Sequence, residues 1–211
     1  MNGALLQDRL SRGMGVAALM IGSQYDLLRP VGPRGPVRPE RRVLRLPAVF
    51  DGGNPGYARP RGYERALRGA FDSAYVAVGD YFVGPRGTLF TAMLPSLARP
   101  ICVLTNAIVD VLRPVGPSVA GLSPYGGVGA SDALMLLLQG WPVQLLASAK
   151  GRVGELPGDG VLAGFGIVLP VVPLGLRVGD VIVDQTGRRF VAGAVDQSEL
   201  GWMITARLVG A

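Results

Sequence analysis

Two different sequence blocks each occur twice in this chain, and this repetition constrains the fold more than any other feature. The first block reads DLLRPVGP at residues 26–33 and DVLRPVGP at residues 110–117, so one position of eight differs. The second block reads VGDYFV at residues 78–83 and VGDVIV at residues 178–183. Because both blocks recur in the same order, a tandem duplication explains the chain better than chance does.

The second block has the pattern of a β-hairpin. In each copy a Gly-Asp pair precedes a short apolar run, a glycine follows, and a second apolar run begins at Phe90 or Phe190. We predict that residues 78–93 and 178–194 form equivalent hairpins in two related β units. The matched residues keep a constant offset of 100, and in the first copy they are Val78, Gly79, Asp80, Val83, Gly87, Phe90 and Ala92.

Asp80 and Asp180 occupy equivalent places in the second block. Two matched carboxylates could be interpreted as a catalytic pair, but a turn role is favoured. An aspartate that follows a glycine at the entrance of a strand can accept hydrogen bonds from nearby backbone N–H groups. The first block contains two prolines and a glycine, which exclude it from a helix interior and predict an extended crossing segment.

The pattern as a whole predicts a mainly β fold: two related small antiparallel β units, barrel- or sandwich-like, from a tandem duplication, with one N-terminal helix. We expect a helix or arm over residues 1–25. A first β unit with a basic extended segment is expected over residues 26–110, and a second β unit over residues 111–211.

Further strands are expected at residues 101–104, 107–112 and 201–209, which are short apolar runs bounded by polar or glycine residues. For residues 63–71 and 132–138 the pattern leaves a short helix and a strand both open.

The N-terminal helix is predicted over residues 4–21 from the three- and four-residue spacing of its apolar positions. Packing on its own domain is favoured, and docking on a neighbouring subunit is the alternative. The apolar positions are Leu6, Leu10, Met14, Ala17, Ala18 and Ile21.

Composition excludes several kinds of site. The chain has no histidine and a single cysteine, Cys102, so it has no histidine-based catalytic triad, no histidine-containing zinc site and no thiolate cage. We therefore expect no catalytic residues, no metal and no organic cofactor. The glycine-rich residues 125–131 lack the Lys-Ser/Thr of a phosphate-binding loop and are expected to form a surface loop.

Two stretches without charge, residues 133–149 and 160–176, have 17 residues each. That length is at the lower limit for a transmembrane helix, and both stretches contain glycine and proline. We expect buried strands there and no membrane insertion.

Basic charge is concentrated in residues 29–68, which contain ten arginines and three acidic residues, for a net charge of +7, whereas the whole chain is +6. Arginine can hold a carboxylate with two hydrogen bonds. We expect an extended arm at an intersubunit boundary, with a nucleic-acid contact as the alternative and a merely solvated face still open. The candidate protein-contact residues are Arg34, Arg38, Arg41, Arg42, Arg45, Arg59 and Arg61.

The chain also resembles a known group of proteins. The similarity lies in residues 6–15, 79–83, 102–106, 125–128, 140–142 and 184–207. These segments resemble virion structural proteins from the late-gene regions of GC-rich tailed bacteriophages and prophages. More loosely, the hairpin pattern of the second block resembles small β-barrel head–tail connection and tail-completion proteins.

The resemblance implies a non-enzymatic virion component with no catalytic residues to transfer. The leading hypothesis is a tail subunit of the neck, tail hub or baseplate that binds other virion structural proteins, with a homo-oligomeric ring as the expected assembly. It would be located in the virion tail after assembly in the host cytoplasm. The alternatives are a basic nucleic-acid-binding protein and, less favoured, a carboxylate-dependent cell-wall hydrolase.

Overall fold

The computed structural model describes residues 3–52, 66–115, 134–148, 164–172 and 174–210 of the 211-residue chain. In this part the chain forms a long N-terminal helix, two short 3₁₀-helices and twelve β-strands. The elements are α1 (Gly3–Ile21), β1 (Ser23–Leu28), η1 (Pro39–Arg41), β2 (Arg42–Asp51), β3 (Ala66–Ala70), η2 (Ser73–Tyr75), β4 (Tyr81–Gly84), β5 (Gly87–Met93), β6 (Ile101–Leu104), β7 (Ala107–Pro114), β8 (Leu134–Ser148), β9 (Gly164–Leu169), β10 (Val181–Asp184), β11 (Arg189–Ser198) and β12 (Gly201–Gly210).

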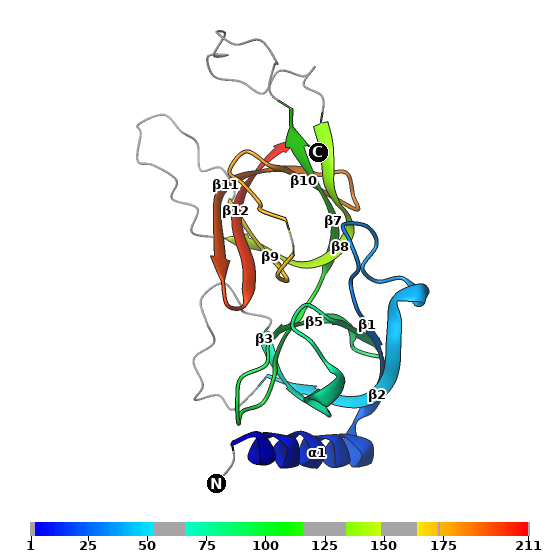
Figure 1. The fold of residues 1–211 in the computed structure, drawn as a ribbon. Coiled ribbons are helices and arrows are strands. Elements are labelled where there is room, and N and C mark those ends of the chain that lie inside the picture. Colours follow the sequence, from blue (N-terminus) through cyan, green and yellow to red (C-terminus); the bar gives the residue numbers. More distant parts are fainter. Residues whose placement is uncertain (1–2, 53–65, 116–133, 149–163, 173, 211) are drawn as a thin grey trace.

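Within the described residues the strands form two closed barrels with the same topology (Figure 1). The first has the order β1-β2-β3-β6-β5-β4, and the second has the order β7-β8-β9-β12-β11-β10. Every neighbouring pair is antiparallel. Each strand of the first barrel thus has a counterpart six strands later, which confirms the predicted mainly β fold of two related units with an N-terminal helix.

The repeated blocks occupy equivalent places in the two barrels. The first block supplies β1 in one barrel and β7 in the other, while the second block supplies β4 and β10. Leu27 of β1 lies opposite Phe82 of β4, and Val111 of β7 lies opposite Ile182 of β10. The two blocks of each copy are therefore neighbouring strands of one sheet.

Both predicted hairpins are present, as β4–β5 and β10–β11. Their pairing differs by one residue: Phe82 pairs with Leu89, whereas Ile182 pairs with Phe190. The turns account for this difference. In the first hairpin Gly84 pairs directly with Gly87, while in the second the Asp184 side chain accepts backbone hydrogen bonds and supports a longer turn.

The remaining strands predicted from the sequence are also present. The strands predicted at residues 101–104, 107–112 and 201–209 are β6, β7 and β12. The two ambiguous segments are strands where they are described, as β3 and the beginning of β8. The glycine-rich segment at residues 125–131 lies outside the described residues. The junction between the barrels is Thr105-Asn106, a few residues before the expected boundary at residue 110.

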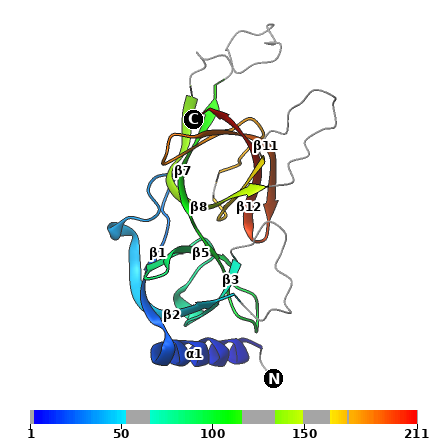
Figure 2. The same cartoon turned by 180° about the vertical axis from the view of Figure 1, so that it is seen from behind.

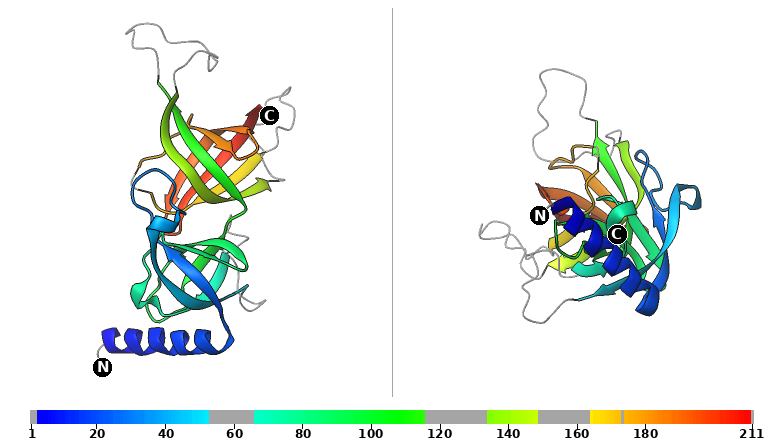
Figure 3. Two further views of the ribbon diagram at one scale, coloured as in Figure 1. Left: turned by 90° about the vertical axis from the view of Figure 1, so that its right-hand side faces the viewer. Right: turned by 60° about the horizontal axis from the view of Figure 1, so that its bottom comes forward.

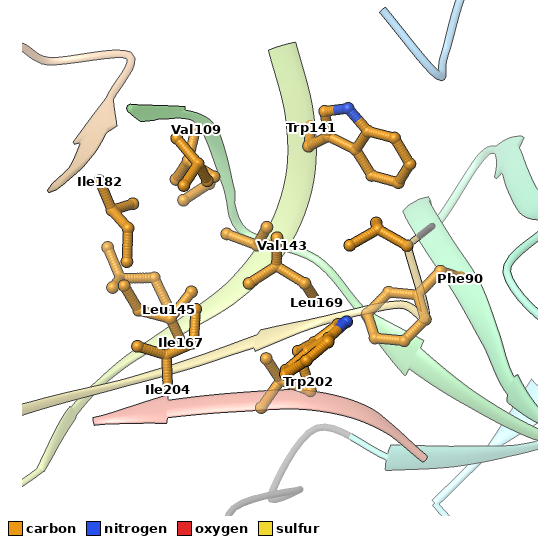
Figure 4. Packing of buried hydrophobic residues seen from close by; sticks show 14 of the residues in the cluster. Phe90, Val109, Trp141, Val143, Leu145, Ile167, Leu169, Ile182, Trp202 and Ile204 are labelled. Atoms are coloured by element: carbon orange, nitrogen blue, oxygen red, sulfur yellow. The ribbon is translucent and has the colours of Figure 1, made fainter. Parts of the chain in front are cut away.

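The two barrels share one hydrophobic core (Figure 4). Aromatic residues of the first barrel, Tyr81 and Phe90, belong to the same buried cluster as Trp141, Ile167 and Trp202 of the second. A separate cluster around Tyr25, Phe50 and Phe82 fills the first barrel. Because one core extends across the junction, we treat the barrels as a single body.

Hydrogen bonds reinforce this junction. The buried Tyr81 hydroxyl donates to the carbonyl oxygen of Pro142 at 2.9 Å. The amide of Asn106 both donates to and accepts from the backbone of Leu145, at 2.8 and 2.7 Å. The carbonyl of Pro33, in the segment after β1, accepts the Trp141 indole N–H at 2.8 Å. The connection from β1 therefore crosses to the second barrel, as expected for an extended segment.

The body is elongated, with different elements at its two ends (Figures 2 and 3). Helix α1 lies across the outer end of the first barrel, and the ribbon made by the ends of β7 and β8 lies at the far end of the second. In the described residues no helix is long and apolar enough to cross a membrane.

Candidate protein-contact surfaces

The predicted contact arginines that the structure describes lie in the segment from the end of β1 to the beginning of β2, which projects on one side of the molecule and at Arg34 bridges to Gln139 of the second barrel (Figure 1). Arg34, Arg38, Arg42 and Arg45 are exposed and Arg41 is half-buried, and together we call them the basic corner. Arg59 and Arg61, the remaining predicted contact residues, lie outside the described residues.

Two of these arginines share an intramolecular partner. Asp26 of β1 accepts a hydrogen bond from Arg45 Nε at 2.9 Å, and Arg42 Nη1 lies 3.6 Å away. The hydrogen bond from Arg45 lowers the pKa of Asp26 below its usual range. Both arginine side chains stay more than half exposed, and surface pairs of this kind contribute about 0–1 kcal/mol, so both arginines still present charge to a partner.

The basic segment is only partly an extended arm. β2 contributes Leu46, Ala48 and Phe50 to the core of the first barrel. The part of the basic segment that forms β2 is therefore a strand of the barrel and not an arm. Arg45 alternates with these buried residues and faces outward, as the two-residue period of a strand requires, whereas Arg42 is exposed beyond the register shift at which Leu28 pairs with it.

Arg29, the first arginine of the basic segment, is part of the fold. Its Nε and Nη2 atoms donate to the two carboxylate oxygens of Asp80 at 2.8 and 2.7 Å, and Nη2 also donates to the Tyr75 carbonyl at 3.1 Å. The hydrogen bond to Asp80 raises the pKa of Arg29 above its ordinary value. Arg29 therefore joins the end of β1 to the entrance of β4.

The second barrel repeats this arrangement. Arg113 donates to both oxygens of Asp180 at 2.8 Å and to the Gly175 carbonyl at 2.7 Å. In both copies the aspartate also accepts a backbone N–H three residues before it, from Ala77 or Arg177, at 2.8 Å. The predicted turn role of the two aspartates is thus confirmed. Sequence reasoning did not identify their arginine partners, although both members of each pair lie in the repeated blocks.

Helix α1 contacts the first barrel through small side chains. Its buried residues are Ser11, Gly15 and Ala18. Ser11 Oγ lies 2.6 Å from Ser73 Oγ, and a Cβ added at Gly15 would lie 3.0 Å from the Cβ of Asp72. The helix packs on its own domain, as expected, but the close approach leaves little room for its larger residues.

Several large apolar residues of α1 are therefore exposed, whereas Leu6, Leu10 and Met14 are half-buried. Leu19, Met20 and Ile21 are 68%, 81% and 77% exposed, and Leu5 and Val16 are more than half exposed. We call these five residues the outer face of α1. Beside the helix is a hollow of about 460 Å³, lined mostly by apolar residues such as Leu10, Met14 and Val49 and also by Arg9, Asp51 and Arg99.

A second apolar surface lies at the opposite end of the molecule. There β7 and β8 continue beyond the barrel as a two-stranded ribbon, in which Pro114 pairs with Leu134. Val115, Leu134, Met135 and Leu136 on this ribbon are exposed. Exposed apolar residues gathered at one end of a molecule are a feature of protein-interaction sites.

The described residues contain no cluster of three or more histidine, cysteine, aspartate or glutamate side chains that could hold a metal ion. Cys102 is buried in the first barrel, and burial raises the pKa of its thiol to about 12, so it is not an activated nucleophile. The fold is a duplicated double β-barrel with candidate contact surfaces on one flank and at both ends. Comparisons with protein-family models, curated proteins and solved structures found no match.

Proposed function

We propose that the protein is a non-enzymatic structural subunit of a tailed-phage virion, in the neck, tail hub or baseplate, which works by assembling with other virion proteins. The observation that supports this most directly is the outer face of α1. A helix that serves only its own domain buries most of its large apolar residues, whereas this helix buries only small residues fully and leaves Leu19, Met20 and Ile21 largely exposed.

The outer face is large enough to hold a partner. Complete burial of one large aliphatic side chain contributes about 1.5–3 kcal/mol, and Val16, Leu19, Met20 and Ile21 are all exposed. Ordering the interface offsets part of this gain. These side chains can therefore contribute part of the affinity of the helix for a neighbouring protein.

The body between the two ends suits a structural role. The shared core and the Tyr81 and Asn106 hydrogen bonds hold the barrels together, so surfaces at the two ends keep a constant separation. A subunit of this form can join one neighbour at α1 to another at the β7–β8 ribbon. Such a subunit needs no catalytic site.

The alternative of nucleic-acid binding depends on the basic corner. Arg29 is committed to Asp80, and Arg42 and Arg45 share Asp26, so part of the predicted positive charge is compensated within the chain. We therefore favour a protein partner. A salt titration of DNA binding tests the alternative, because phosphate contacts give an affinity that falls steeply with salt concentration.

The proposed function is tested by mass spectrometry of purified virions, in which we expect stoichiometric amounts of this chain. Its absence from mature particles would refute the proposal. A double variant, Leu19→Ser with Met20→Ser, tests the role of α1 and should fold normally but fail to be incorporated into particles. The matched control is Ile108→Ser with Val178→Ser, which removes two exposed apolar residues of the second barrel and should leave incorporation unchanged.

A further inference from the structure

The hairpin formed by β11 and β12 carries two exposed carboxylates at its tip. Asp196 and Glu199 are exposed, and neither is in an ion pair within the described part of the chain. We call these two residues the acidic tip. They differ from the aspartates of the duplicated pairs, which are buried and bound to arginine.

The turn that presents the acidic tip is well defined. Ser198 Oγ donates to the Gly201 carbonyl and accepts the backbone N–H of Leu200, both at 3.2 Å. The side chain of Leu200 is buried in the core that the two barrels share. These contacts fix the backbone of the turn, so little backbone entropy is lost when the acidic tip binds a partner.

The acidic tip and the basic corner lie on opposite flanks of the molecule. In Figure 1 the β11–β12 hairpin ends at the left, near the junction of the barrels, and the segment between β1 and β2 projects at the right at a similar height. Figure 2 shows the same relation from behind. A neighbouring copy displaced sideways, without a change of height, would bring one surface against the other.

We propose that the acidic tip of one copy docks on the basic corner of a second copy, so that the protein assembles head to tail. This inference rests on the proposed function and deepens it by naming a second copy of this chain as one partner. Guanidinium groups of the corner would hold the carboxylates of the tip through charge-assisted hydrogen bonds. A head-to-tail contact uses two different surfaces, and it forms a ring when the rotation between copies closes.

Charge also explains why the contact joins unlike surfaces. Two basic corners facing each other would bring arginines of both copies together, and two acidic tips would bring carboxylates together. Like charges placed across an interface disfavour such a pairing. Opposite charges on opposite flanks favour the head-to-tail arrangement over a two-fold symmetric one.

The test uses charge reversal in the full chain. Arg34→Glu with Arg38→Glu reverses the basic corner at two exposed positions, and Asp196→Arg with Glu199→Arg reverses the acidic tip. Wild type should form oligomers in size-exclusion chromatography with light scattering. Each double variant should weaken self-association by at least about 30-fold, because the corner variant removes most of the charge that attracts the tip and the tip variant makes both surfaces positive.

A mixture of the two double variants distinguishes a head-to-tail contact from any other. The variant with the reversed corner keeps an acidic tip, and the variant with the reversed tip keeps a basic corner, so these two natural surfaces can still bind each other. At the exchanged positions the corner then carries two carboxylates and the tip two guanidinium groups, so these groups can pair with the opposite polarity. The mixture should therefore form oligomers that neither variant forms alone, and the quadruple variant should form them by itself. Failure of both to assemble would overturn the proposal.

Arg189→Glu with Arg207→Glu is the matched control, since both arginines are exposed on the second barrel and Arg189 lies at the other end of β11 from the tip. This variant should self-associate like wild type. If it weakened self-association as much as the corner and tip variants do, the proposal would be overturned. Circular dichroism verifies that every variant is folded. A monomeric wild type would refute the head-to-tail contact, whereas absence of the chain from virions would refute the proposed function, so the two failures are distinguishable.

Discussion

Arg113 and Asp180 lie 67 residues apart in the sequence and are joined by two hydrogen bonds of 2.8 Å. Arg29 and Asp80 make the same pair in the first barrel. In each copy the arginine belongs to the first repeated block and the aspartate to the second. The ion pair therefore connects the two parts of the sequence that the duplication has kept most similar.

Replacing Arg113 by alanine should lower the free energy of unfolding by about 3 kcal/mol, because it leaves the buried carboxylate of Asp180 without its charged partner. Arg29→Ala should cost less, since the Arg29 side chain is 44% exposed and water can replace part of its interaction. Urea unfolding measures both. Arg207→Ala, at an exposed position, is the control and should stay within about 0.5 kcal/mol of wild type. An equally small effect of Arg113→Ala would contradict the structural role of the pair.

Asp184 should contribute a pH-dependent part of the stability. Burial acts to raise the pKa of its carboxyl group, but hydrogen bonds from Thr186 and Arg188 outweigh burial and lower the pKa below the ordinary value. A lowered pKa in the folded state stabilises the protein above the unfolded-state pKa of about 3.9, and this stabilisation is lost as the pH falls through the folded-state value. The stability difference between wild type and Asp184→Asn should therefore be largest near neutral pH and shrink below about pH 4. Urea titrations at several pH values measure it, and a constant difference would exclude this origin.

Cys102 should be unreactive in the native protein. Burial raises the pKa of its thiol to about 12, so the thiolate is scarce and inaccessible at neutral pH. Labelling with a thiol reagent should be slow in buffer and rapid in urea. Because the chain has no other cysteine, the signal has a single source. Rapid labelling under native conditions would show that the first barrel opens readily.

The two barrels should unfold in one transition, because they share a core. Trp141 and Trp202, the tryptophans of the chain, both lie in the second barrel, so fluorescence monitors that barrel while far-UV circular dichroism monitors both. The two signals should give the same midpoint. Tyr81→Phe leaves the Pro142 carbonyl without its donor and should lower both midpoints together, at a cost of about 1–3 kcal/mol. Separate midpoints would show that the barrels unfold independently.

Much of the fold could be predicted because its determinants are local. Apolar runs bounded by glycine define the β4–β5 and β10–β11 hairpins, and three- and four-residue spacing defines α1. The duplication added information about tertiary structure, since two related blocks in the same order predict two related units. The ambiguous residues 63–71 could not be assigned from periodicity alone, and pairing with β2 and β6 makes the described part of that segment a strand.

The surfaces required the tertiary structure. Spacing groups Leu6, Leu10, Met14 and Ala18 on one stripe of α1, but only packing against the barrel reveals that Ser11 and Gly15 are buried and Met20 is exposed. Likewise, arginine density marks residues 29–68 without distinguishing arginines that stabilise the fold from those that face a partner.

The sequence by itself determined the duplicated β architecture and the position of the helix, because short-range patterns and repeated segments carry that information. Only the tertiary structure decided that Arg29 is joined to Asp80, that β2 is a core strand, and that the acidic tip and the basic corner lie on opposite flanks. The physical reason is that these relations depend on how closed sheets bring residues together across tens of positions in the chain. Hydrophobic burial determines that arrangement for the whole molecule at once.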